Sequence, residues 1–126
     1  MSKIVQLKDQ EGVSLYPKVL EEYSTTEQVV GKWLGKPLYR KVFQFTNLPN
    51  AQDMTLGDVG TNIDFARIDY GKSYMTWREP FTYSIGRNIW TTEFIINDNK
   101  QIAVQGNGDL RAFKVILVVE YTKTTD

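Results

Sequence analysis

The strongest constraint on the fold is an alternation of apolar side chains near the C-terminal end of the chain. Between Leu110 and Thr122 a period of two places one set of side chains on each face of an extended strand. The even positions mix Ile116 and Val118 with Lys114 and Glu120. The odd positions are all apolar: Phe113, Val115, Leu117, Val119 and Tyr121. We therefore predict that this strand lies in the middle of the hydrophobic core.

Shorter segments of the same kind precede it, and turn-forming residues separate them. Thr61 to Tyr70 and Asn88 to Ile96 alternate apolar and polar residues, whereas Ser73 to Ser84 is aromatic and interrupted by Pro80. Thr46 to Asp58 contains several turn formers and is expected to be a loop. The pattern predicts an all-β fold, an antiparallel β-sandwich or jelly-roll-like single domain of seven to nine strands over residues 1–126.

A β-hairpin is predicted near the start of the chain. Val29 to Leu34 and Leu38 to Phe45 read as its two strands, and Gly35-Lys36 supplies the turn, since glycine tolerates the positive φ of tight hairpins. Before the hairpin, Ser24 to Glu27 matches a helix-capping box. We expect a loop or a single turn there, with a short helix as the alternative.

The amino-acid composition excludes several functional classes. The chain has no histidine and no cysteine, which removes disulfides, ordinary zinc sites, thiol nucleophiles and histidine acid–base catalysis. Lysine plus arginine equals aspartate plus glutamate at 15 each, so no net charge attracts nucleic acid. The longest apolar run, Val115 to Val119, is too short to span a bilayer. We expect a protein that is not an enzyme, has no catalytic residues, metal or cofactor, binds no nucleic acid and inserts into no membrane.

One aromatic segment is the candidate ligand site. Tryptophan and tyrosine rings stack on the apolar C–H faces of sugars, and arginine and glutamate bind hydroxyl groups. A saccharide platform with Trp77 as the stacking ring is one reading, and ordinary core packing is the other. The residues of the candidate platform are Tyr74, Trp77, Arg78, Glu79 and Tyr83.

Two further aromatic residues are candidates for a subunit interface. Trp33 lies near the predicted hairpin tip and Tyr39 in the second hairpin strand. Paired carboxylates that would hydrolyse a glycosidic bond are a weaker reading, because Asp64 and Asp69 have opposite parity in one strand.

Three segments resemble tail and baseplate proteins of phages and prophages of Gram-positive bacteria. They are MSKIVQLKDQEGVSLYPKV at the start, Tyr23 to Phe45, and VILVVEYTKTTD at the end. The resemblance implies a non-enzymatic structural protein of the virion that assembles in the host cytoplasm and belongs to the host-adsorption apparatus. It also implies a homo-oligomer, most commonly a trimer, with residues 1–22 as an N-terminal docking segment.

The same resemblance implies the partners: other tail or baseplate proteins and, where the chain contacts the host directly, a cell-wall saccharide. No coiled-coil or collagen-like stalk follows the first segment, which favours a compact baseplate or neck component over an extended fibre. A free-standing carbohydrate-binding module is the alternative function, and a glycan hydrolase is a third.

Overall fold

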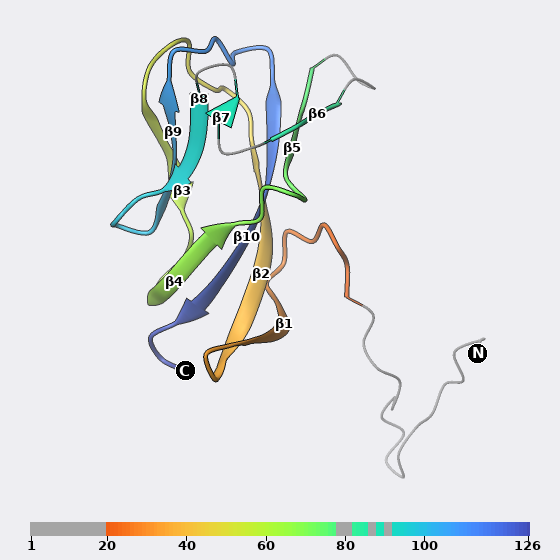
Figure 1. Cartoon of the computed structure of the whole chain (residues 1–126), viewed down its shortest axis with the longest axis vertical. Helices are drawn as coiled ribbons and strands as arrows, with labels where there is room; N and C mark the ends of the chain where they lie inside the picture. The colour runs from red at the N-terminus through yellow and green to blue at the C-terminus, as the bar shows by residue number, and fades with distance from the viewer. Residues whose placement is uncertain (1–19, 78–81, 86–87, 90–91) are drawn as a thin grey trace, which may run out of the picture.

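The computed structural model describes residues 20–77, 82–85, 88–89 and 92–126, and these form β-strands without an α-helix (Figure 1). In the described ranges, no helix is present that is long and apolar enough to cross a membrane. Ten strands follow one another in the described ranges: β1 (Gln28–Trp33), β2 (Lys36–Phe45), β3 (Met54–Asp58), β4 (Ile63–Ile68), β5 (Tyr74–Thr76), β6 (Thr82–Ser84), β7 (Asn88–Ile89), β8 (Thr92–Ile96), β9 (Gln101–Gly106) and β10 (Lys114–Lys123).

The strands form two antiparallel sheets in a sandwich-like single domain. The larger sheet has the order β1-β2-β10-β5-β6, with β4 also paired to β10, and the smaller has the order β3-β9-β8-β7. The predicted fold class is therefore confirmed. The strand number is higher than expected because Met54–Asp58, predicted to lie in a loop, pairs with β9, and because two predicted strands are each divided into two.

Strand β10 is the centre of the larger sheet. It pairs with β2 from Val115 opposite Phe45 to Tyr121 opposite Tyr39, and with β4 and then β5 along its other side. The hydroxyl of Ser73 lies between these two partners, where it accepts a hydrogen bond from the Val118 amide at 2.9 Å. It also donates to the carbonyl of Asp69 at 2.8 Å. Ser73 therefore satisfies a buried amide where the chain passes from β4 to β5.

Both faces of β10 are buried. Leu117 is 0% exposed and belongs to the main core between the sheets. On the opposite face, Ile116 and Val118 join Val42 in a second cluster, against which Tyr74 packs. The expectation that the longest alternating strand lies in the core is confirmed, and its apolar even positions are explained by the second cluster.

The first hairpin forms with a turn one residue earlier than expected. Its turn residues are Leu34 and Gly35, whereas Lys36 already belongs to β2 and pairs with Trp33. Their φ angles are +49° and +84°, the signs that a two-residue type I′ turn requires at both positions. The Gly35-Lys36 turn was wrong because lysine at the second position would lack the freedom of glycine at positive φ.

The segment before β1 is a loop, which agrees with the preferred expectation. The amide of Thr26 donates to the Ser24 hydroxyl at 3.1 Å, a local turn in place of a helix cap. The carbonyl of Ser24 accepts from the Val42 amide at 2.9 Å, so the loop is fastened to the edge of β2. This loop and β1 lie side by side in Figure 1 and form the walls of the site described next.

Candidate functional site

Two residues of the predicted saccharide platform, Tyr74 and Trp77, have described side chains, and these pack in different places. Tyr74 is half-buried on the second cluster and meets Tyr23 edge to face, with ring centroids 5.8 Å apart. Trp77 is also half-buried, and its ring lies 6.4 Å from that of Phe113, which packs against the main core. The two rings therefore belong to different parts of the hydrophobic interior.

The remaining platform residues are only partly covered by the structure. Arg78 and Glu79 lie outside the described residues. Tyr83 occupies β6, where its backbone pairs with Met75 of β5, and its side chain lies outside the description. The saccharide-binding assignment stays a prediction that rests on Trp77.

Trp33 makes its aromatic contacts within the chain. Its ring is stacked on Phe65 with centroids 5.0 Å apart and an interplanar angle of 2°. The guanidinium of Arg67 lies 4.6 Å from the centre of the same ring. Glu120 in turn holds Arg67 through two hydrogen bonds to Oε1, at 2.7 and 3.0 Å. The contacts of Trp33 fix the hairpin onto β4, although the two strands are not neighbours in the sheet.

Tyr39, the second predicted interface residue, makes contacts within the chain through both its ring and its hydroxyl. The ring stacks on Tyr121 at 5.7 Å, and Nζ of Lys123 lies 4.3 Å from its centre. The hydroxyl donates to Asp126 at 2.6 Å. This hydrogen bond to a carboxylate, together with burial, raises the pKa of Tyr39 to about 12.

Glu27 connects the loop before β1 to the centre of the large sheet. Its Oε1 accepts a short hydrogen bond from the Tyr121 hydroxyl, and its Oε2 accepts from Lys123 at 2.9 Å. Partial burial pushes the pKa of Glu27 upward, but the hydrogen bonds from Tyr121 and Lys123 outweigh it and leave the pKa below its ordinary value. Burial first, and then the bond to Glu27, raises the pKa of Tyr121. The carboxylate is therefore ionised and fully engaged near neutral pH.

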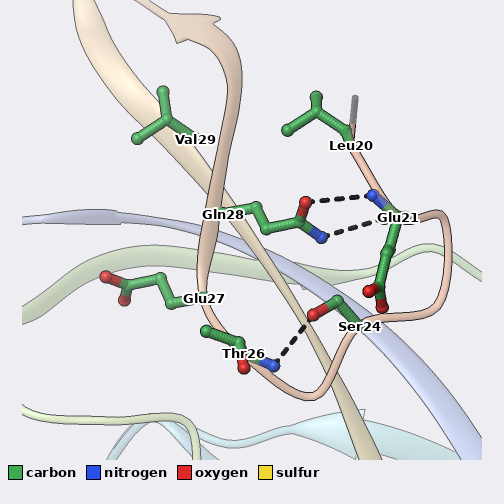
Figure 2. Close-up of a pocket in the computed structure, with 7 residues that line it drawn as sticks. All are labelled: Leu20, Glu21, Ser24, Thr26, Glu27, Gln28 and Val29. Carbon is green, nitrogen blue, oxygen red and sulfur yellow. Dashed lines mark hydrogen bonds between the residues drawn. The ribbon is translucent and has the colours of Figure 1, made fainter. Parts of the chain in front are cut away.

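A groove of about 660 Å³ lies between this loop and the start of β1 (Figure 2). Leu20 and Val29 stand on its two sides and are 44% and 55% exposed. The side-chain amide of Gln28 crosses from β1 to the loop, where it donates to the Glu21 carbonyl at 2.9 Å and accepts from the Glu21 amide at 3.1 Å. Arg40 donates to the same carbonyl at 3.1 Å. These bonds connect the loop to β1 and β2, so the spacing between the two walls of the groove is fixed.

Leu34, at the tip of the hairpin, was missed by the sequence reasoning. Its side chain is 92% exposed and its φ is +49°. A left-handed backbone costs an ordinary residue about 1–2 kcal/mol, and asparagine or aspartate is the usual choice at this position of a type I′ turn. The signal in the sequence is a leucine directly before a glycine at a two-residue hairpin turn, which would have predicted an exposed leucine at the tip. Exposure and backbone strain in one residue mark Leu34 as a candidate contact residue.

Exposed apolar side chains gather around β1. Within the described ranges, five large hydrophobic residues are classed as exposed, and Met54 in β3 is the one that lies elsewhere. The other four occupy a short stretch of sequence: Leu20, Tyr23, Val29 and Leu34. In the described part of the larger sheet, β1 is also an edge strand that pairs with β2 alone, so its outer backbone groups face away from the sheet. This side of the molecule is the best candidate for a contact with another protein.

The carboxylates considered for glycan hydrolysis make ordinary surface contacts. Asp64 pairs with Lys36 at 3.0 Å, and Asp69 accepts a hydrogen bond from the Gly71 amide in a turn. Over the ranges that the structure covers, no group of three or more histidine, cysteine, aspartate or glutamate side chains is placed to hold a metal ion.

Comparisons with known proteins leave the chain without an assigned relative. No protein-family model, curated protein or solved structure matches it.

Proposed function

We propose that this chain is a non-enzymatic structural component of a phage tail tip or baseplate, that it acts in host adsorption, and that it works as a homo-oligomer, most simply a trimer. The observation that carries the proposal is the concentration of exposed apolar side chains on and beside the free edge strand β1. Monomeric soluble proteins rarely leave such surface open, and edge strands are normally protected. A subunit of a larger particle covers it on assembly.

The segments that resemble phage proteins support the same proposal. Tyr23 to Phe45 forms the loop and the β1–β2 hairpin, and the segment from Val115 onward forms most of β10. The two are far apart in sequence but lie side by side, from Val115 opposite Phe45 to Tyr121 opposite Tyr39. These two resembling segments thus make one contiguous unit, β1-β2-β10, and the candidate contact side belongs to it. The first resembling segment, with most of the predicted docking segment 1–22, lies outside the described residues.

The partners follow from this role. We expect other tail or baseplate proteins to contact the chain in the virion, and a cell-wall saccharide to be the host ligand if the chain reaches the cell surface. Many copies on one particle make a weak saccharide contact effective through avidity.

The experiment is the mass of the native protein in solution, measured by multi-angle light scattering at tens of micromolar. We expect three times the chain mass of 14.5 kDa. A strictly monomeric protein at that concentration would contradict the assembly role and favour a free-standing binding module.

A further inference from the structure

We propose that the Leu34 tip of one copy inserts into the groove between Leu20 and Val29 of a second copy, so that the oligomer assembles head to tail. This inference rests on the proposed oligomeric function and names the surfaces that mediate it. The occupant of the groove is therefore a second copy of this chain.

The tip has the properties of an inserting residue. Leu34 is almost fully exposed and adopts a left-handed backbone that asparagine would adopt with less strain. With 92% of the residue exposed, contacts with the described part of the chain offset little of either cost. The hairpin behind the tip is held in place, because the ring of Trp33 is stacked on Phe65 and is contacted by Arg67. A contact residue on a rigid element loses little conformational entropy when it binds.

The groove has the properties of a socket. Its lining includes two exposed apolar residues, Leu20 and Val29, and its volume of about 660 Å³ is large enough for a leucine side chain (Figure 2). The Gln28 amide and Arg40 fix the loop wall, so the socket is formed before a partner arrives. Filling it buries Leu34, Leu20 and Val29 together, which is the favourable step in association.

The charges that flank the two surfaces are complementary. Lys32 lies beside the tip and Glu21 lines the groove. In the described part of the chain, no hydrogen bond or ion pair is made by the Lys32 ammonium or the Glu21 carboxylate. By contrast, Lys36 is paired with Asp64, and Glu27 with Lys123. The charges left available are thus one cation at the tip and one anion at the groove, an arrangement that selects orientation and speeds encounter.

In the proposed trimer each copy meets two different neighbours, so the contact between tip and groove is heterologous. Leu34 follows the last residue of β1, whereas Gln28 and Val29 at the beginning of β1 line the groove. A strand of six residues is about 20 Å long, so the tip does not reach the groove of its own copy. Each copy therefore offers one tip and one groove, and such a contact produces a closed ring when the rotation between copies permits it.

The test compares the native masses of the wild type and of Leu34→Asn, with Met54→Thr as the control for loss of an exposed apolar side chain elsewhere. We expect Leu34→Asn to be a folded monomer of 14.5 kDa whose thermal stability is not lower than that of the wild-type chain under monomeric conditions. The control should keep the wild-type mass. An oligomeric wild type together with an equally oligomeric Leu34→Asn overturns the inference and leaves the proposed function standing. A monomeric wild type overturns both.

Two further measurements identify the direction of the contact. Val29→Glu destroys the groove but keeps the tip, whereas Leu34→Asn does the reverse, so an equimolar mixture of the two monomers should give a dimer of one copy each. Glu21→Lys and Lys32→Glu should each raise the dissociation constant at least about tenfold, and the double variant should restore it. A mixture that stays monomeric, or a double variant weaker than both single variants, overturns the head-to-tail arrangement.

Discussion

The hydroxyl of Tyr121 donates a hydrogen bond to Oε1 of Glu27, which lies 94 residues earlier in the chain. Lys123 completes the arrangement with a hydrogen bond to Oε2 at 2.9 Å. One carboxylate therefore fastens the loop before β1, which is a wall of the groove, to the central strand of the large sheet.

The first prediction is a pH dependence that comes from Glu27. Its pKa in the folded protein is below the ordinary value, so the ionised form stabilises the fold above the unfolded pKa of about 4.3, and this stability is lost as the pH falls through the folded pKa. Glu27→Gln should lower the free energy of unfolding at pH 7 by about 0.5–1.5 kcal/mol, the net contribution of a typical hydrogen bond. Urea titrations should show the difference between wild type and variant shrinking below pH 4. A difference that stays constant down to pH 3 would contradict it.

The second prediction contrasts two leucines. Leu117 is 0% exposed in the main core, so Leu117→Ala should lower the free energy of unfolding by about 2–5 kcal/mol. Leu34→Ala removes the same atoms from a residue that is 92% exposed. It should change the free energy of unfolding by less than about 0.5 kcal/mol. Urea unfolding of both variants at a concentration where the chain is monomeric gives the comparison. Equal losses would mean that the tip packs against its own chain.

The core was predictable because burial on a strand has a simple period. The alternation from Phe113 to Tyr121 requires one buried face, and β10 occupies the middle of the large sheet as that pattern indicates. The second buried face, with Ile116 and Val118, was not predicted, because Lys114 and Glu120 share these even positions. What covers each face depends on pairings between distant segments, and no local pattern in the sequence specifies them.

The site was much less predictable, for three physical reasons. The groove depends on a side-chain amide, that of Gln28, bonding to the backbone of Glu21, and glutamine has no distinctive pattern for such a bond. Trp33 stacks on Phe65 across strands that are not sheet neighbours, so its contacts could not be read from the hairpin. Leu34 was assigned to a strand because it is apolar, and the turn was placed one residue late.

A third prediction concerns the junction between β4 and β5. Ser73 is 3% exposed, and its hydroxyl accepts from the Val118 amide and donates to the Asp69 carbonyl. Ser73→Ala leaves this buried amide without a partner and should lower the free energy of unfolding by about 1–3 kcal/mol. Ser24→Ala is the control, because its hydroxyl bonds to Thr26 in an exposed turn, and it should cost less than about 0.5 kcal/mol. Thermal unfolding that ranks the two variants in the opposite order would show that the Val118 amide finds another partner.

The final prediction tests the saccharide contact that the sequence predicts for Trp77. The net gain per sugar hydrogen bond is only about 0.5–1.5 kcal/mol, so loss of a stacking ring should dominate the change in affinity. Trp77→Ala should weaken binding to purified host cell wall at least about tenfold, measured by co-sedimentation with circular dichroism as the check on folding. Met54→Ala is the control, since this exposed side chain lies in β3 outside the candidate platform and its loss should leave binding as in the wild type. Unchanged binding by folded Trp77→Ala would remove Trp77 from the site, and a wild type that does not bind cell wall would leave the chain a purely structural role.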